Sequence, residues 1–93
     1  MRSISSIRWT AKSIEHIAGH GVKPEEVEEA CFSQDDVPFI RSGRGNLHYV
    51  FGKTDSGRFL FMVVRFLRPG EVSLITARDM SSWEKNYFTK RGK

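Results

Sequence analysis

The spacing of hydrophobic and polar positions changes along the chain, and each spacing predicts a different element. Between residues 11 and 20, apolar side chains recur at i, i+3 and i+4, which is typical of a helix that Thr10 can cap. A second helix is predicted from Pro24 to about Ser33, because proline suits a first helical turn and two glutamates follow it. Gly21 separates the two segments, so we expect an N-terminal helical hairpin with an acidic outer face.

The second half of the chain carries strand patterns. Residues 58–67 form an almost unbroken apolar run, which indicates a central strand covered over most of its surface. Residues 68–71 contain proline and glycine and predict a tight turn, after which residues 72–77 predict a second strand. Residues 47–51 alternate between two faces, and residues 39–41 begin a further strand. Three consecutive hairpins of this kind predict an antiparallel meander.

Together these elements predict an α+β domain that spans residues 1–93 as one unit. We expect an antiparallel β-sheet meander of three to four strands, the N-terminal helical hairpin, and a C-terminal helix capped by Ser81 or Ser82. Residues 3–8 predict only a weak first strand. The expected core positions of the central hairpin are Phe59, Phe61, Val63 and residues 72–75.

The charge is divided unevenly along the chain, although the formal net charge is only +4. Residues 1–36 hold four Lys/Arg against seven Asp/Glu, a net of −3, whereas residues 37–93 hold eleven against four, a net of +7. A basic half of this kind is typical of a nucleic-acid or phosphate partner. An ordinary solvated basic surface remains an equal alternative.

The composition argues against several classes of protein. The single cysteine, Cys31, excludes an internal disulfide and fits a reducing compartment. No signal peptide is expected, and no apolar run approaches the length that crosses a membrane. Cys31, His16, His20 and His48 lack the spacing of zinc ligands, so no metal site is predicted. Cys31 falls on the apolar face of the second helix, where a thiol is usually inert packing.

A basic and aromatic set of side chains remains as the candidate chemistry. RNA cleavage without a metal needs a base for the 2′-hydroxyl, cations for the phosphorus-centred transition state, an acid for the leaving oxygen and rings that stack on bases. Arg78 stands out because it follows a strand and faces the predicted C-terminal helix, which suits either a structural ion pair or a phosphate contact. The set consists of Arg41, Arg44, His48, Arg58, Arg65, Arg78, Lys85, Tyr87, Lys90 and Arg91.

Short motifs spread over most of the chain occur in the order found in one family of bacterial toxins. They are Trp9, Lys12, His20-Gly21-Val22, Pro24-Glu25-Glu26, Ala30-Cys31-Phe32, Tyr49-Val50-Phe51-Gly52, Ser56-Gly57-Arg58, Ile75-Thr76-Ala77-Arg78 and Glu84. In these motifs the sequence resembles the BrnT-type toxins, within the broader RelE/ParE-like toxins of type II toxin–antitoxin systems. It departs from them at Gly19, where the family usually has lysine. It also departs at the position of the family's C-terminal aromatic residue, where Phe88 offers no phenol and Tyr87 lies beside it. Residues 35–46 are also shorter and more basic than the family's acidic loop.

The resemblance implies a RelE-like fold and a metal-independent ribonuclease that inhibits translation in the bacterial cytoplasm. It also implies a cognate antitoxin protein that neutralises the toxin and provides the only contact with DNA, and it implies no cofactor and no membrane. Arg58 and Arg78 are the expected catalytic cations, and His20 is a candidate proton-transfer group. The expected RNA-binding residues are Arg44, Lys85, Tyr87, Lys90 and Arg91.

Two other functions stay open at this point. One is a non-catalytic, protein-binding or RNA-binding relative of the same fold, which the missing basic residue at Gly19 favours. The other is a sequence-nonspecific nucleic-acid-binding module, with Tyr49, Phe51 and Tyr87 as stacking rings. His20 also has a plain structural interpretation, because a histidine near a helix C-terminus is stabilised by the helix dipole.

Overall fold

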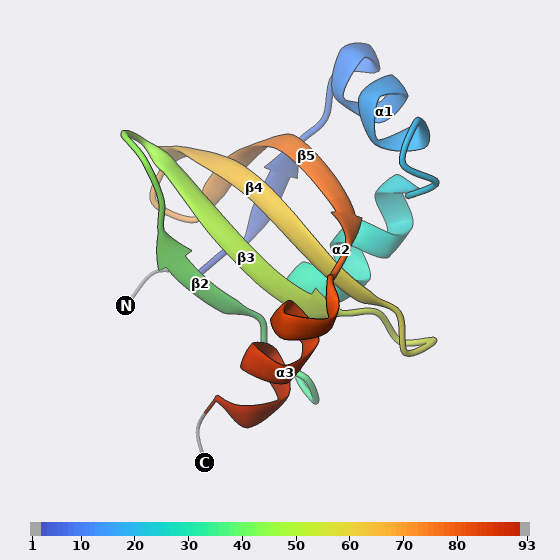
Figure 1. The fold of residues 1–93 in the computed structure, drawn as a ribbon. Helices are drawn as coiled ribbons and strands as arrows, with labels where there is room; N and C mark the ends of the chain where they lie inside the picture. The colour runs from blue at the N-terminus through green and yellow to red at the C-terminus, as the bar shows by residue number, and fades with distance from the viewer. Residues whose placement is uncertain (1–2, 92–93) are drawn as a thin grey trace.

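The computed structural model describes residues 3–91 and contains one five-stranded sheet with helices on both of its faces (Figure 1). The predicted α+β class is confirmed. The elements in chain order are β1 (Ser6–Arg8), α1 (Ala11–Ala18), α2 (Pro24–Phe32), β2 (Phe39–Ser42), β3 (Leu47–Lys53), β4 (Phe59–Arg68), β5 (Glu71–Asp79) and α3 (Ser82–Lys90).

The strand order in the sheet is β1-β5-β4-β3-β2. The neighbours from β2 to β5 pair antiparallel, whereas β1 pairs in parallel with β5 and places Ile7 opposite Val72. The predicted antiparallel meander is present as the four strands β2 to β5, but the prediction of a sheet of three to four strands is wrong, because β1 adds a fifth strand and makes the sheet mixed. β1 is only three residues long, and its pairing depends on a strand more than sixty residues later in the chain.

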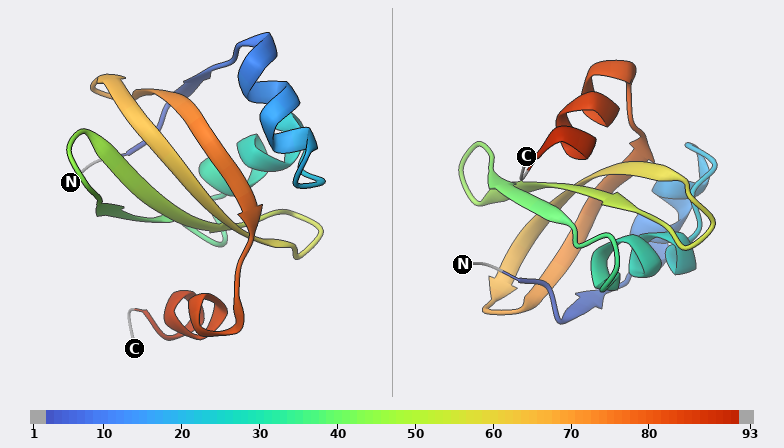
Figure 2. Two further views of the ribbon diagram at one scale, coloured as in Figure 1. Left: turned by 45° about the horizontal axis from the view of Figure 1, so that its top comes forward. Right: turned by 90° about the horizontal axis from the view of Figure 1, so that it is seen from below.

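The two N-terminal helices do not form the predicted helical hairpin. α1 packs on β5, while α2 packs on β3 and β4, so each helix covers its own part of one sheet face. We call this the α1–α2 face, and the opposite one the α3 face; Figure 2 shows α3 on the other side of the sheet from α1 and α2. Gly21, with φ of 72°, turns the chain between the helices, and Ile17 and Val27 are both buried against the sheet.

The α1–α2 face carries the main hydrophobic core. Alternate residues of β4 point to this face, and Leu60, Met62 and Val64 are completely buried there. Ile17 of α1 and Val27 of α2 close over them. Full burial of an aliphatic side chain of this size contributes about 1.5–3 kcal/mol. This face therefore provides most of the hydrophobic stabilisation.

The core positions predicted for β4 are wrong. Phe59, Phe61 and Val63 are only partly buried, because they point to the α3 face. On β5, Val72 is buried as predicted, whereas Ile75 is 37% exposed. A continuous apolar run does not show which of its residues face which side, and this is the physical reason for the error.

α2 approaches β3 closely because Gly52 has no side chain. A Cβ atom on Gly52 would lie 3.0 Å from both the Cβ atom and the carbonyl oxygen of Ala30. Any larger residue at position 52 would push the helix away from the sheet. The small residues at 30 and 52 thus set the distance between α2 and the core.

α3 begins where β5 ends, and a capping box fixes its first turn. The Ser81 hydroxyl accepts a hydrogen bond from the Glu84 amide, and the Glu84 carboxylate accepts one from the Ser81 amide. Phe88 of α3 packs beside Phe51 in a second, smaller core. The face is not fully covered, since Arg41 on the same side of the sheet is exposed.

Candidate nucleic-acid interface

Two neighbouring cross-strand rows on the α3 face bring basic and aromatic side chains together. The row nearer α3 consists of Phe39, Phe51, Phe61 and Arg78. The next row, which we call the open row, consists of Arg41, Tyr49, Val63 and Thr76. Because the strands pair in this register, residues that are distant in sequence form one continuous surface.

Side chains from two helices reach the ends of the open row. At one end, Arg41 Nη1 donates to the Tyr87 hydroxyl of α3 at 3.0 Å. At the other end, His16 Nε2 of α1 lies 3.1 Å from Thr76 Oγ1. His16 can reach this position because β1 pairs with β5 only as far as Ser73, which leaves Thr76 at the edge of the sheet. The surface therefore combines a cation, phenol rings and an imidazole.

Arg78, a predicted catalytic residue, lies beside this row and is bound to α3. Its Nη1 and Nη2 atoms donate to the two carboxylate oxygens of Glu84 at 2.8 and 3.0 Å, and Nη1 also donates to the Asp79 carbonyl. The guanidinium carbon lies 4.4 Å from the ring centre of Phe61. The hydrogen bonds to Glu84 raise the pKa of Arg78. The side chain of Arg78 is 42% exposed, so solvent still reaches it.

Glu84 is the buried half of this ion pair. Its side chain is only 4% exposed, and its pKa is lowered chiefly by the hydrogen bonds from Arg78 and further by the Ser81 amide. The same carboxylate therefore caps α3 and fixes the helix to the end of β5. Removing Arg78 would leave a buried, unpaired carboxylate, which is costly.

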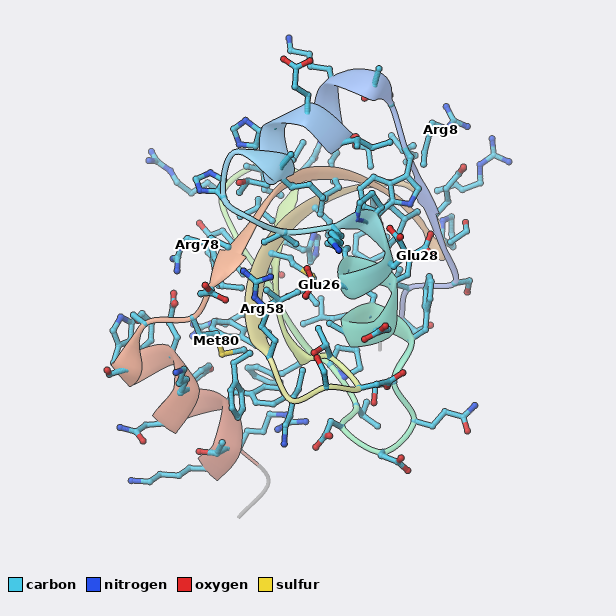
Figure 3. The ribbon with its side chains drawn as sticks, turned by 90° about the vertical axis from the view of Figure 1, so that its right-hand side faces the viewer. Arg8, Glu26, Glu28, Arg58, Arg78 and Met80 are labelled. Atoms are coloured by element: carbon cyan, nitrogen blue, oxygen red, sulfur yellow. The ribbon has the colours of Figure 1, made fainter. Side chains whose placement is uncertain are left out.

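Arg58, the second predicted catalytic cation, is held in a structural network through its Nε and Nη1 atoms. Its Nε donates to Asp79 Oδ1 at 2.7 Å, and its Nη1 donates to the Gly21 carbonyl at 2.8 Å and to Glu26 Oε1 at 3.0 Å. Figure 3 shows Arg58 and Glu26 pointing toward each other. Arg58 thereby joins the start of β4, the end of β5, α2 and the turn before it.

The charges of this network reinforce one another. The hydrogen bond to Asp79, and then that to Glu26, raise the pKa of Arg58. The pKa of Asp79 is lowered chiefly by Arg58, and that of Glu26 first by the Lys23 backbone amide and then by Arg58. All three groups are held in their charged forms. The network stabilises the corner of the fold where these segments meet.

The structure places Arg58 and Arg78 on opposite faces of the sheet. Arg58 contacts Glu26 of α2, whereas Arg78 contacts Glu84 of α3, and Figure 3 shows them on either side of β5. Asp79 and Arg78 are consecutive strand residues, whose side chains point in opposite directions. One phosphate therefore does not meet both guanidinium groups in this arrangement.

His20 lies in the turn after α1 and not within the helix, which ends at Ala18. The side chain is exposed, and its ring centre lies 5.4 Å from that of His16. His16 is the histidine that reaches the open row, and sequence reasoning considered it only as a metal ligand. Its i, i+4 spacing to His20 was the available signal, but the contact with Thr76 depends on the packing of α1 against β5.

The predicted RNA-binding residues are divided between two ends of the molecule. Lys85, Tyr87 and Lys90 all lie on α3, and Lys85 Nζ is 5.8 Å from the ring centre of Phe59. Arg91 folds back on the protein, where it donates to the carbonyls of Phe88 and Val37. Arg44 lies in the turn between β2 and β3, separated from the α3 end by the length of β3, about 20 Å.

Within residues 3–91, no three histidine, cysteine, aspartate or glutamate side chains are grouped in a way that could hold a metal ion. None of the helices in the same range has the length and apolar character needed to cross a membrane.

Comparison with known proteins gave no match to any family model, to any curated protein or to any solved structure. The geometry of the α3 face is therefore the basis for the functional proposal.

Proposed function

We propose that the protein is a ribonuclease toxin that binds RNA along the open row and cleaves it without a metal ion. The observation that carries this proposal is the open row itself, in which Arg41, Tyr49 and the Thr76–His16 pair share one exposed surface beside Arg78. Cations, a stacking ring and an imidazole are the groups that RNA cleavage requires.

In the proposed reaction, His16 takes the proton of a ribose 2′-hydroxyl. The freed oxygen attacks the adjacent phosphorus, the bond from phosphorus to the 5′-oxygen breaks, and a 2′,3′-cyclic phosphate forms. Arg78, two residues after Thr76 on β5, stabilises the charge on the phosphorus-centred transition state, and water protonates the leaving 5′-oxygen. Arg41 and Tyr87 lie three strands away, about 14 Å at the usual strand spacing, so they bind the flanking RNA.

The resemblance to the BrnT-type toxins supports the biological part of the proposal. The protein acts in the bacterial cytoplasm, slows translation, and is neutralised by a cognate antitoxin that also provides the DNA contact. Expression should then arrest growth, and co-expression of a small neighbouring gene should restore it. Normal growth despite abundant folded protein would contradict the toxin function.

A second function, a non-catalytic protein- or RNA-binding relative of the same fold, is favoured by one specific observation. Both predicted catalytic cations are engaged with carboxylates, Arg58 with Asp79 and Glu26, and Arg78 with Glu84. In this alternative, RNA or a protein occupies the open row and no bond is broken.

The two functions are separated by variants that change charge while conserving shape. Glu84→Gln releases Arg78 from its ion pair but keeps the guanidinium, so RNA cleavage in EDTA should continue. Adding Arg78→Gln to this variant keeps an amide-to-amide contact and removes the cation. Cleavage should then fall about 10²–10³-fold, as expected when one transition-state contact is lost.

His16→Gln provides the matching test of proton transfer, with His20→Gln as its control. We expect His16→Gln to lower the cleavage rate at least about 10²-fold and His20→Gln to leave it unchanged. RNA binding that weakens with salt, but without cleavage in any of these proteins, would support the non-catalytic alternative.

A further inference from the structure

A cavity of about 770 Å³ opens beside β2 on the α1–α2 side, away from the open row. Its walls come from the N-terminal segment, the end of α2, β2 and Arg91, and they are mostly apolar. His48 lines it and is only 8% exposed, yet its Nδ1 atom has no hydrogen-bond partner within the described residues.

β2 is an edge strand, and its free side adjoins the cavity. The Gly43 amide donates to the Leu47 carbonyl, which identifies this pair as hydrogen-bonded. In an antiparallel ladder such pairs alternate with non-bonded pairs, so Arg41 bonds with β3 whereas Ile40 and Ser42 do not. The amides and carbonyls of Ile40 and Ser42 therefore point away from the sheet, and the side chains of the same two residues line the cavity.

We propose that an extended, acidic segment of a partner protein pairs with β2 as a sixth strand and inserts apolar side chains into this cavity. The outward backbone groups of Ile40 and Ser42 supply the main-chain pairing, and the cavity accepts every second side chain. The remaining side chains of such a strand fall on the same side as Arg41, where acidic residues fit.

Charge decides between this occupant and a second copy of the chain. Arg91 lines the cavity, Arg41 lies on β2 and Arg44 lies in the turn after it, while Asp35 and Asp36 line a different hollow beside residues 53–57. In a symmetric dimer the arginines of one copy would face those of the other across the two-fold axis, and like charges opposite each other are destabilising. An acidic partner strand meets the same arginines favourably.

The test uses the whole protein and a synthetic seven-residue peptide, blocked at both ends, that alternates glutamate with leucine. Isothermal titration should show binding, and the same peptide with lysine in place of glutamate should bind at least about tenfold more weakly. Ser42→Pro removes one outward amide that β3 does not use, and an edge position tolerates proline. We expect this variant to keep its melting midpoint and to bind the acidic peptide at least about tenfold more weakly.

Methylated peptides keep the proposal testable if Ser42→Pro unfolds. One peptide carries N-methyl groups on the leucine amides and the other on the glutamate amides. Only one of these sets faces β2, so one peptide should lose binding and the other should retain it. Loss with the leucine set indicates an antiparallel partner, and loss with the glutamate set a parallel one.

Several results would overturn the proposal. They are equal binding by both methylated peptides, equal binding by the lysine peptide, no binding of the acidic peptide at millimolar concentration, or a dimer in sedimentation equilibrium that Ser42→Pro dissociates. Because no step involves RNA, peptide binding and RNA cleavage are measured separately on the same protein, and the failure of one is distinguishable from the failure of the other.

Discussion

On the α1–α2 face the sheet presents aliphatic side chains that are completely buried, whereas on the α3 face it presents aromatic rings and arginines that, apart from the buried Phe51, are only partly covered. Leu60, Met62 and Val64 of β4 belong to the first face, and Phe59, Phe61 and Val63 of the same strand belong to the second. A single ten-residue strand thus supplies both surfaces.

This difference separates stability from recognition. Aliphatic burial is non-directional and strong, so the α1–α2 face holds the fold together. Aromatic rings and guanidinium groups lose less stabilising free energy than aliphatic side chains do when they stay partly exposed. In that position they can still stack on bases and bind phosphates. The α3 face keeps such groups available because α3 packs mainly on Phe51 and Phe59 and leaves Arg41 of the open row exposed.

The largest expected effect comes from placing the same charge on each face in turn. Val64→Asp puts a carboxylate into the core, which costs several kcal/mol out of a total of about 5–15, so we expect the chain to be unfolded. Val63→Asp, one residue away, faces the partly open side and should leave a cooperative transition. Circular dichroism melts of the two variants check this, and a greater loss for Val63→Asp would mean that the faces of β4 are reversed.

Removing the Arg58 network should have the next largest effect. Arg58→Met leaves Asp79, Glu26 and the Gly21 carbonyl without their shared donor, and we expect a loss of about 1–2 kcal/mol, because the pairs are partly exposed. Arg65→Met is the matched control on the α3 face, since Arg65 is exposed and should change stability by less than about 0.5 kcal/mol. Urea denaturation compares the two variants. An unchanged unfolding midpoint for Arg58→Met would contradict its structural role and would favour a role in binding.

Lowering the pH should destabilise α3, because Glu84 becomes protonated. Its pKa is lowered in the folded protein from an ordinary value of 4.5, so its stabilising contribution is complete above that pH and is lost as the pH falls through the lower, folded value. In a Trp9→Phe background, the fluorescence of Trp83 reports on α3 alone. The change should occur below pH 4.5 and should be weaker in Glu84→Gln, and identical titrations of both proteins would exclude Glu84 as the cause.

The smallest expected effects on stability concern the two tryptophans. Trp9 donates its indole N–H to Glu28 Oε2 at 2.9 Å on the α1–α2 side, whereas Trp83 on α3 is 63% exposed. Trp9→Phe should lower stability by about 1 kcal/mol through the lost hydrogen bond, and Trp83→Phe should leave it nearly unchanged. If Trp83→Phe is instead the costlier change, α3 is packed more tightly than its exposure indicates. Trp83→Phe should nevertheless weaken RNA binding if the ring stacks on a base.

Much of the local structure was determined by the sequence itself. Thr10 and Ser81 cap their helices as predicted, and Val27, Ala30 and Cys31 form the buried side of α2. Burial raises the pKa of the Cys31 thiol to about 12, which agrees with the prediction of an inert packing residue. These features depend on residues within one helical turn of each other, and such short-range preferences can be read from the chain directly.

The candidate site was predicted only in part, because position along a strand does not specify contacts. The sequence indicated that Arg78 would lie between the end of a strand and a helix, and both an ion pair and a phosphate contact were open. The ion pair with Glu84 is present, and the phosphate contact stays a prediction. His16 was missed, because only the packing of α1 on β5 brings it to Thr76.

The features that depend on pairing between distant segments were decided only by the tertiary structure. The parallel pairing of β1 with β5 joins segments from the two halves of the chain, and no local pattern in three residues specifies it. The apolar run of β4 gave no period from which its faces could be assigned, so Val63 and Val64 acquired their different roles only when α2 and α3 packed on opposite sides. Short-range sequence preferences therefore set the elements, and the burial of one sheet face against two helices set which side chains remained free for function.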